Sequence, residues 1–350
     1  MPETMSRVHN QEAKVVKYSA LQPLSPEDQR VAALMLCRFF SPFNSQAHRE
    51  DLGLPPTPQT IRPLSLHQFF QWAKKKHQID LWPHMQRIRE VVLRMVTKGF
   101  LIPAGNARGG PMTGEYYYFM RERTTLEHKG YLFLGPALGA PFIGTFCSAA
   151  TCLITGTDEN GDCHSGSGVL LGSRTVATCA HVITEMTLDE VLYMDGVEFG
   201  IEDAKADEDV DVGFITLASP VEHPLPDLAL RGGRLLEDIV VLGYPPVPTG
   251  REPVCTAHRG EVCGFVEKTL SGSALMLFSA IARPGNSGGP VVSLDGRVVG
   301  LASQLLVSTS LDKEKDKARL PFFAAVPAVD VMAAAERLGT ADPIPWEDYQ

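Results

Sequence analysis

The chain has 350 residues, of which 44% are hydrophobic and 21% are charged, and it carries a formal net charge of −9. These proportions are typical of a soluble globular protein, and the length favours two domains over one. No apolar run approaches the roughly 18 residues that span a bilayer, and the N-terminal residues lack the apolar stretch of a secretory signal, so we expect a cytoplasmic protein with no membrane partner.

The seven cysteines and the distribution of charge add two further expectations. An odd number of cysteines without a metal-type C-x-x-C pair is typical of reduced cytoplasmic thiols, and we expect no disulfide framework, no metal and no cofactor. The first 125 residues have a net charge of +7, whereas the remaining 225 have a net charge of −16. The chain therefore combines a basic front end with an acidic body.

Helix signals dominate the N-terminal third, after a tail at residues 1–21. Ser25 caps the segment "SPEDQRVAALMLCRFF", Ser65 caps "SLHQFFQWAKKKH", and the longer segment "PHMQRIREVVLRMVTKG" ends at Gly99. Two β-rich runs, "FLIP" and "YYYFM", then flank a glycine-rich stretch and predict a hairpin. This order of elements resembles a winged-helix domain, α-rich and spanning residues 22–122.

The third predicted helix carries basic residues on the face opposite its apolar stripe. These are Arg87, Arg94 and Lys98, and Arg108 lies at the tip of the predicted hairpin. In DNA-binding winged helices the corresponding face enters the major groove, so the resemblance implies contact with DNA as one partner of this domain. A partner protein is the alternative, as is a face that is only solvated, since Glu90 interrupts the basic row.

We expect a junction between domains at residues 123–140, where glycine and proline occur without sustained periodicity. The sequence pattern changes after this junction. Short β-branched runs broken by glycine and aspartate follow, and they predict an antiparallel sandwich or barrel. The segment "AVDVMAAAERL" predicts a helix at the end of this region, and residues 339–350 are expected to form a C-terminal tail.

Three motifs in the β-rich region carry side chains suited to catalysis. "TCAHV" contains His181, "DVGFITL" begins at Asp211, and "GNSGGP" contains Ser287 and is followed by the strand pair "PVVSLDGRVVGLAS". With these motifs in this order, the chain resembles the chymotrypsin/trypsin-like serine proteases over residues 141–338. Its nearest likeness is to the bacterial-type HtrA/DegP-like branch. The resemblance implies an all-β double barrel with a C-terminal helix.

The resemblance also implies a role for each of these residues. Ser287 would be the nucleophile, His181 the general base that takes its proton, and Asp211 the acid that fixes the histidine tautomer. Backbone N–H groups of Gly285 and Ser287 would form the oxyanion hole. Asp209 competes for the role of the acid, because it lies two residues away on the same strand face, but the motif places Asp211 directly before the apolar run.

The motifs also indicate where substrate specificity and control would arise. By position, the primary pocket would be lined by Ile281, Ala282, Ser303, Gln304 and Leu305. No acid lies at its expected base, which favours small or medium apolar side chains over Arg or Lys. Secreted relatives are activated by a new N-terminal amine that pairs with an aspartate beside the serine. Asn286 occupies that position here, so we expect control through the N-terminal domain or through loop ordering.

Two hypotheses follow from the whole sequence. The first is an active serine endopeptidase with protein substrates, whose N-terminal domain acts as a sensor or adaptor for one dedicated target. Its tandem architecture resembles that of proteases in bacterial defence and signalling. The second is a DNA- or protein-binding regulator in which the protease fold is a scaffold of little or no activity. The complete set of His181, Asp211 and Ser287 favours the first hypothesis.

Overall fold

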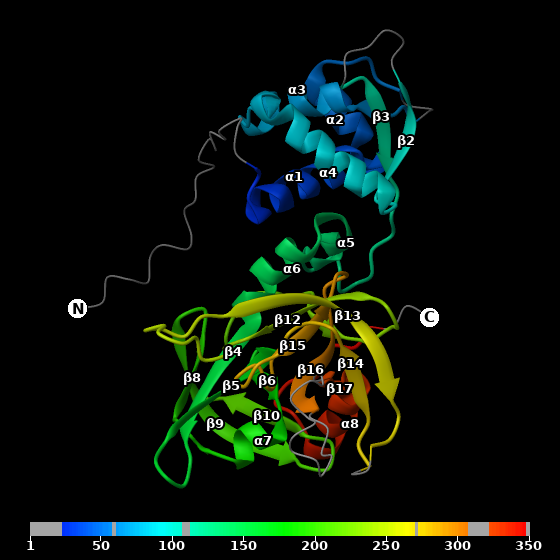
Figure 1. The fold of residues 1–350 in the computed structure, drawn as a ribbon. Coiled ribbons are helices and arrows are strands. Elements are labelled where there is room, and N and C mark those ends of the chain that lie inside the picture. The colour runs from blue at the N-terminus through cyan, green and yellow to red at the C-terminus, as the bar shows by residue number, and fades with distance from the viewer. Residues whose placement is uncertain (1–22, 58–60, 107–112, 270–271, 307–321, 348–350) are drawn as a thin grey trace, which may run out of the picture. The chain divides into compact units, whose positions relative to one another are not determined.

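The computed structural model describes residues 23–57, 61–106, 113–269, 272–306 and 322–347 (Figure 1). The chain divides into two compact units, Met1–Glu122 and Arg123–Gln350, which we call the N-terminal unit and the C-terminal unit. Among these described residues, none of the helices combines the length and the apolar character needed to cross a bilayer.

The N-terminal unit packs helices against a small antiparallel sheet. Its helices are α1 (Pro26–Phe39), α2 (Ser45–Leu52), α3 (Leu66–His77) and α4 (Met85–Thr97), with short 3₁₀ turns at Pro42–Asn44 and Trp82–His84. Its strands β1 (Leu64–Ser65), β2 (Leu101–Asn106) and β3 (Glu115–Phe119) pair in the order β1-β3-β2.

Local sequence explains where these helices begin. The Ser25 side chain accepts the Asp28 N–H at the start of α1, and a capping box between Ser65 and Gln68 starts α3. Fully buried aromatic side chains, with Phe39 beside Trp72, then fix how the helices pack. The hairpin is present as expected, whereas α2 and β1 were not predicted from the sequence. The winged-helix assignment itself stays a prediction.

The C-terminal unit contains two closed antiparallel barrels of six strands each, in agreement with the expected double barrel (Figure 1). The first barrel has the ring order β4-β5-β6-β10-β9-β8 and closes where β8 pairs with β4. Its strands are β4 (Thr151–Thr157), β5 (Cys163–Leu170), β6 (Thr175–Thr178), β8 (Val191–Met194), β9 (Val197–Asp207) and β10 (Val212–Leu217), and the short β7 (Thr187–Leu188) adds to the edge of β4.

The second barrel has the ring order β12-β13-β14-β17-β16-β15 and closes where β15 pairs with β12. Its strands are β12 (Asp238–Gly243), β13 (Thr256–Val266), β14 (Leu275–Phe278), β15 (Pro290–Ser293), β16 (Arg297–Leu306) and β17 (Phe322–Pro327), and β11 (Ala229–Leu230) pairs in parallel with β16. Inward-facing Ile239, Val262, Met276 and Val299 fill its core, as the alternation of side chains along strands requires. The expected C-terminal helix is α8 (Ala328–Leu338).

The segment expected to be a junction differs from the prediction. Within residues 123–140 the chain forms a 3₁₀ turn at Leu132–Leu134 and a short helix, α5 (Gly135–Leu138), and α6 (Ala140–Cys147) follows directly. Leu132, Phe133 and Leu134 are buried in the C-terminal unit, so tertiary packing overrides the glycine and proline signals.

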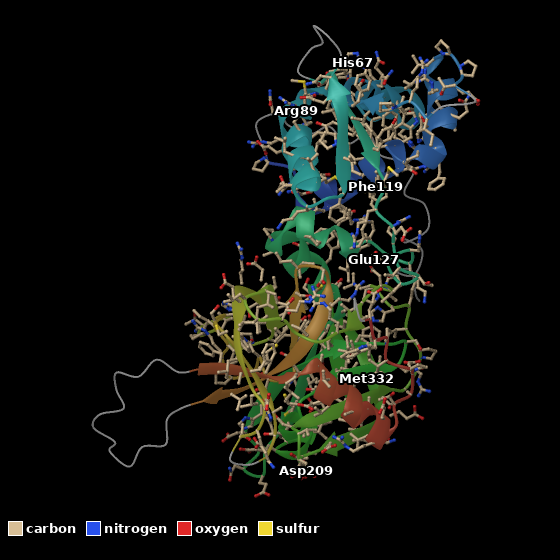
Figure 2. The ribbon with its side chains drawn as sticks, turned by 90° about the vertical axis from the view of Figure 1, so that its right-hand side faces the viewer. His67, Arg89, Phe119, Glu127, Asp209 and Met332 are labelled. Atoms are coloured by element: carbon tan, nitrogen blue, oxygen red, sulfur yellow. The ribbon has the colours of Figure 1, made fainter. Side chains whose placement is uncertain are left out.

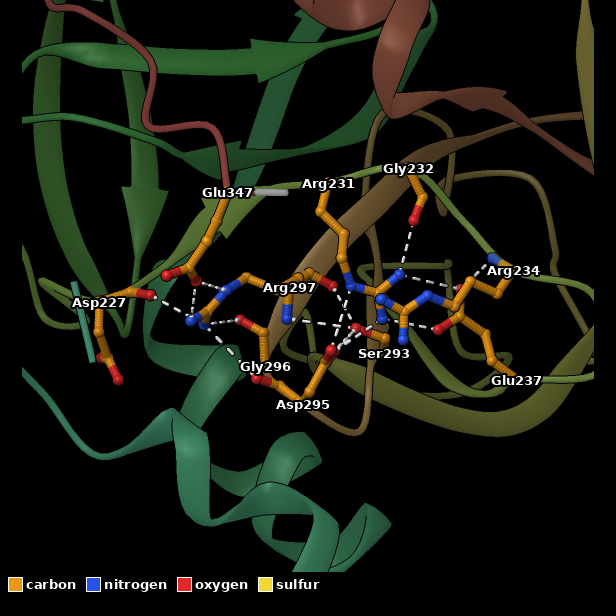
Figure 3. Close-up of polar contacts among 10 residues, drawn as sticks. All are labelled: Asp227, Arg231, Gly232, Arg234, Glu237, Ser293, Asp295, Gly296, Arg297 and Glu347. Atoms are coloured by element: carbon orange, nitrogen blue, oxygen red, sulfur yellow. Dashed lines mark hydrogen bonds and ion pairs between the residues drawn. The ribbon is translucent and has the colours of Figure 1, made fainter. Parts of the chain in front are cut away.

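The expected C-terminal tail is also part of the C-terminal unit as far as residue 347. Asp342 accepts hydrogen bonds from the backbone N–H groups of Arg174 and Thr175, at 2.6 and 3.1 Å. Glu347 pairs with the fully buried Arg297 of β16, whose Nε donates to it at 2.6 Å (Figure 3). These polar contacts hold residues 339–347 against the C-terminal unit, although their sequence shows no periodic pattern.

Candidate active site

Strand pairing in the first barrel brings His181 and Asp211 together. Strand β6 ends at Thr178, and the short helix α7 (Ala180–Thr184) begins two residues later with His181 in its first turn. Asp211 stands directly before β10, whose residue Gly213 pairs with Thr178 of β6. Asp211 has a φ of +56°, a left-handed conformation that aspartate tolerates better than most residues.

The imidazole of His181 and the carboxylate of Asp211 are hydrogen-bonded. Nδ1 of His181 lies 2.8 Å from Oδ1 of Asp211, which also accepts the backbone N–H of His181 at 3.1 Å. Asp209, the competing acid, is exposed in the turn before Asp211 (Figure 2). Since Nδ1 faces a carboxylate, it carries the proton and leaves Nε2 as the basic nitrogen.

Burial and pairing shift the pKa values of both groups. Burial lowers the pKa of His181, but the hydrogen bond to Asp211 and its negative charge outweigh burial, so the pKa lies above the usual 6.5. Burial raises the pKa of Asp211, but the hydrogen bonds and charge of His181, together with a hydrogen bond from Ser303, bring it below the usual 3.8. The pair is thus arranged to hold a carboxylate against an imidazole that gains positive charge.

Ser303 makes a contact that was not expected from the sequence. Its Oγ donates to Oδ2 of Asp211 at 2.5 Å, so a residue of β16 in the second barrel is hydrogen-bonded to the carboxylate of the first. No local motif marks a hydroxyl that reaches a carboxylate 92 positions away, and the assignment of Ser303 to the primary pocket stays a prediction.

Ser287 lies in a loop that is hydrogen-bonded to the first barrel through Ser167 of β5. The role of Ser167 was not predicted from the sequence. The backbone N–H of Ser167 donates to the Ser287 carbonyl at 2.8 Å, and its Oγ donates to the Gly285 carbonyl at 2.6 Å. Gly288 has a φ of +81°, and a Cβ there would lie 2.2 Å from the Ser167 carbonyl oxygen. The glycine is therefore required for the close approach of the two barrels at this point.

His181 and Ser287 line one cavity of about 400 Å³, together with Gly285 and Pro284. The hydroxyl of Ser287 donates to the Ser303 carbonyl at 3.4 Å, a long hydrogen bond. The structure thus brings base, acid and hydroxyl to one place, with the hydroxyl turned to a backbone acceptor.

Comparison with known proteins agrees with this geometry. Residues 166–301, which include His181, Asp211 and Ser287, match the family of the trypsin-like peptidase domain. This chain carries a trypsin-like peptidase domain. The likeness to HtrA/DegP serine proteases, expected from three motifs, is confirmed.

The peptidase domain is similar to serine protease Do-like HtrA of Bacillus subtilis, with 27% identity over 198 residues that cover 52% of this chain and 41% of the relative. It is also similar to serine protease HTRA1 of Xenopus laevis, with 34% identity over 148 residues that cover 39% of this chain and 30% of the relative. The chain therefore spans less than half the length of these relatives.

Two solved structures are also similar to part of this chain. The Rv3671c protease of M. tuberculosis in its active form has 18% identity and a TM-score of 0.46, covering 58% of this chain and 86% of that one. The serine endoprotease of Yersinia pestis has 17% identity and a TM-score of 0.44, covering 56% of this chain and 65% of that one.

The expected oxyanion-hole donors are the backbone N–H groups of Gly285 and Ser287. Gly285 has a φ of +92°, and a Cβ there would lie 2.7 Å from the Tyr244 carbonyl oxygen, so glycine is required. Within the described residues, the N–H groups of Gly285 and Ser287 donate to no protein acceptor. Asn286 lies between these two residues, and its side chain is buried. Neither Oδ1 nor Nδ2 of this side chain has a hydrogen-bond partner among the described residues.

Of the residues expected in the primary pocket, Ile281 and Ala282 do not line the 400 Å³ cavity. Ile281 is half exposed, and Ala282 packs against the core of the second barrel. Gln304 and Leu305 continue β16, but their side chains lie outside the described part of the structure. The assignment of Ile281, Ala282, Gln304 and Leu305 to the primary pocket stays a prediction.

Cys179 adds a third potential metal ligand to the peptidase site. Its Sγ and the ligand atoms of His181 and Asp211 lie within 4.8 Å of one another. Burial, together with the nearby Asp211 charge, raises the pKa of the Cys179 thiol well above its usual value, and the thiol donates to the Ala302 carbonyl at 3.4 Å.

The basic residues of α4 are partly engaged within the N-terminal unit. Arg87 pairs with Glu90 at 3.2 Å, and Arg94 donates to the Gln29 side chain of α1 at 2.6 Å. Lys98 is exposed, and Arg108 lies outside the described residues. Contact of this face with DNA or a partner protein stays a prediction.

Proposed function

We propose that this chain is a serine endopeptidase that hydrolyses peptide bonds through an acyl-enzyme. The observation that carries the proposal is the fixed His181–Asp211 pair, 2.8 Å apart, facing the same cavity as Ser287. The trypsin-like peptidase domain supports it.

In the proposed reaction, Nε2 of His181 takes the proton of the Ser287 hydroxyl as its oxygen attacks the scissile carbonyl. The hydroxyl must first exchange the Ser303 carbonyl for His181 as its acceptor, a small side-chain rotation of the kind that unliganded active sites commonly require. Asp211 holds the ring and stabilises its positive charge, and the protonated ring then donates to the leaving amine. A water molecule then gives a proton to His181 and attacks the acyl-enzyme. The ester bond to Ser287 breaks, the acyl half of the substrate leaves as a carboxylic acid, and Ser287 regains its proton from His181.

The developing oxyanion would be bound by the N–H groups of Gly285 and Ser287. Because these donors have no other acceptor within the described residues, no protein hydrogen bond is broken there when the oxyanion forms. Loss of one such donor typically lowers kcat by about 10²–10³-fold.

A fluorophosphonate probe tests the proposal directly, since it reacts with activated serines. We expect the wild-type chain to be labelled, the Ser287→Ala variant not to be labelled, and the His181→Ala variant to be labelled far more slowly. Labelling of Ser287→Ala at the wild-type rate would assign the reactivity to another residue. An unlabelled wild-type chain would support the scaffold hypothesis.

We also propose that the N-terminal unit selects or senses the protein target of the endopeptidase. The division of the chain into two compact units supports this role. The engagement of Arg87 and Arg94 within the unit favours a protein partner over DNA. A gel-shift assay with duplex DNA at low and high salt separates the two partners, since DNA binding through phosphate contacts weakens steeply as salt rises.

The proposed setting is cytoplasmic, in bacterial defence or signalling. The seven cysteines are all free, which supports a reducing compartment. The tandem layout supports the setting by analogy of architecture. Fractionation of source cells, with the protein found outside the cytoplasm, would overturn the location.

A further inference from the structure

A second and larger pocket, of about 910 Å³, lies beside the catalytic cavity within the C-terminal unit. This volume is in the range of pockets that enclose several side chains or a drug-sized ligand. The pocket is formed between strands of the first barrel, through Leu153 and Tyr193, and the segment that joins β12 to β13, through Tyr244 and Val254. None of these four residues belongs to the proposed catalytic machinery.

The two cavities share part of their wall. His164 and Ser165, both on β5, line the 400 Å³ catalytic cavity and the 910 Å³ pocket alike. Strand β5 pairs with β4 along its length, but its other edge pairs with β6 only at Val169 and Leu170. In the described residues the backbone at His164 and Ser165 thus presents a strand edge without a neighbouring strand, to which an extended peptide can add.

The position of the pocket indicates which half of a substrate would enter it. The residues expected to receive the acyl-side side chain, such as Ile281, Ala282 and Ser303, do not line it. A chain that crosses Ser287 and continues past β5 therefore carries its leaving-group half, the residues C-terminal to the scissile bond, into the larger pocket.

The pocket lining combines an apolar floor with an acidic rim. Leu153, Tyr193 and Val254 supply apolar surface, and 54% of Val254 is exposed. Asp189, Asp195 and Glu252 supply carboxylates, and all three are exposed. No lysine or arginine among the described residues lines the pocket. This chemistry fits a segment with an apolar anchor flanked by Lys or Arg, because the carboxylates attract basic side chains and repel acidic ones.

We propose that the 910 Å³ pocket binds the leaving-group segment of a polypeptide substrate and selects apolar residues flanked by Lys or Arg there. The inference rests on the proposed endopeptidase function and names the substrate class of the same site.

The test compares three substrates with the same acyl-side sequence. One ends in a coumarin amide, and two are internally quenched peptides whose leaving-group halves contain Lys-Leu-Lys or Glu-Leu-Glu. We expect the wild type to have a kcat/KM about tenfold higher for the Lys-Leu-Lys peptide, because its lysines form exposed ion pairs with the carboxylates and the glutamates of the other peptide are repelled. The preference should shrink as salt rises.

Variants connect the preference to the pocket. We expect Glu252→Lys to lower the Lys-Leu-Lys to Glu-Leu-Glu ratio at least about threefold, and Val254→Ser to lower kcat/KM for both peptides. Asp203→Lys makes the same charge change at an exposed residue outside the pocket and should leave the ratio unchanged. Asp203→Lys should also hydrolyse the coumarin amide at the wild-type rate, and labelling of all three variants by the fluorophosphonate shows that they are folded.

The outcomes separate the two proposals. A wild-type ratio near one, or a ratio that Glu252→Lys and Asp203→Lys alter equally, overturns the inference while coumarin hydrolysis continues. A wild type that neither hydrolyses the coumarin amide nor reacts with the fluorophosphonate overturns the endopeptidase function itself.

Discussion

At the scale of single residues, the Asp211 carboxylate is hydrogen-bonded to side chains from both barrels. One carboxylate oxygen accepts from His181 of the first barrel, and the other accepts from Ser303 of the second. With both oxygens occupied, the carboxylate cannot rotate without breaking a short hydrogen bond. The orientation of His181 therefore depends on the correct docking of both barrels.

The raised pKa of His181 predicts the pH dependence of hydrolysis. Only the neutral imidazole accepts the Ser287 proton, so kcat/KM should fall as pH drops through the pKa, and the acid limb should lie above the usual 6.5. In Asp211→Asn the carboxylate charge is lost, so the limb should move to lower pH, with kcat lowered by about 10⁴-fold. Profiles of kcat/KM from about pH 5 to 9 measure both effects. An acid limb that Asp211→Asn leaves in place contradicts this assignment of the acid.

Removal of the Ser303 hydroxyl should impair catalysis without loss of the fold. A hydrogen bond to a charged group contributes about 1.5–3 kcal/mol, so we expect Ser303→Ala to lower kcat about tenfold or more. Because Asp211 then loses a donor, its charge stabilises the imidazolium more strongly, and the acid limb of the pH profile should move upward. Ser303→Thr keeps the hydroxyl and should retain most of the activity. If the Ala variant keeps the wild-type pH profile, Ser303 does not position Asp211.

The residues that the sequence could reveal are those whose motifs are local. His181, Asp211 and Ser287 each stand in a short string that requires a particular turn, so their order alone predicts the site. Ser303 and Ser167 act across the barrel interface, and their neighbours in sequence carry no trace of that contact. Only the folded chain relates them to Asp211 and Gly285.

At the scale of elements, the C-terminal segment after α8 stabilises the first barrel through one side chain. Asp342 accepts from the N–H groups of Arg174 and Thr175 and from the Ser173 hydroxyl. We expect Asp342→Ala to lower the free energy of unfolding by about 2–3 kcal/mol, because buried donors lose their acceptor. Urea denaturation followed by fluorescence measures this loss, with Asp203→Ala as an exposed control. Equal midpoints for the two variants would contradict the anchoring role.

The 3₁₀ turn at Leu132–Leu134 is held by Asp227, and this predicts a pH-dependent stability. Oδ2 of Asp227 accepts the Leu132 N–H at 2.6 Å, while Oδ1 is buried without a partner in the described residues. Burial raises its pKa to about 6. The Leu132 N–H and the charge of Arg297 oppose this rise, and Glu127 adds to it. The neutral form is thus favoured in the folded chain more than in the unfolded chain.

The sign of the effect follows from linkage. Since the folded pKa exceeds the unfolded value of 3.8, the contribution of Asp227 is fully present below about pH 4 and is lost as pH rises through about 6. Asp227→Asn cannot ionise, so its unfolding free energy relative to wild type should increase by about 2 kcal/mol between about pH 4 and 7. Denaturation at several pH values gives this difference. A difference that is constant with pH would show that Asp227 is not protonated near pH 5 in the folded chain.

The elements that sequence reasoning missed share one physical cause. The helices α5 and α6 and the segment after α8 have no long amphipathic pattern, and partners far along the chain stabilise them. Gly135 is an example, because a Cβ there would lie 2.0 Å from the Leu294 carbonyl oxygen. The glycine that looked like a loop signal is a packing requirement. The barrel strands, with their β-branched runs, were predictable because their pattern is local.

At the scale of the whole molecule, every residue of the proposed catalytic site lies in the C-terminal unit, whereas the basic excess of the chain lies in its first 125 residues. Under the proposed adaptor role, this division would separate the chemistry from the choice of target. The acidic C-terminal unit would attract basic substrates at long range, in the same direction as the acidic rim of its 910 Å³ pocket.

Removal of the N-terminal unit should therefore change what the enzyme cleaves and not whether it can cleave. We expect residues 123–350 alone to react with the fluorophosphonate and to hydrolyse a short peptide at a rate comparable to the full chain, because domains with their own core commonly fold independently. Cleavage of proteins in an extract of the source cell should lose its selectivity, as measured by the new N-termini that each form generates. An identical set of cleavage sites for the two forms would contradict the adaptor role. A fragment that is folded but unreactive would show that the N-terminal unit completes the catalytic site.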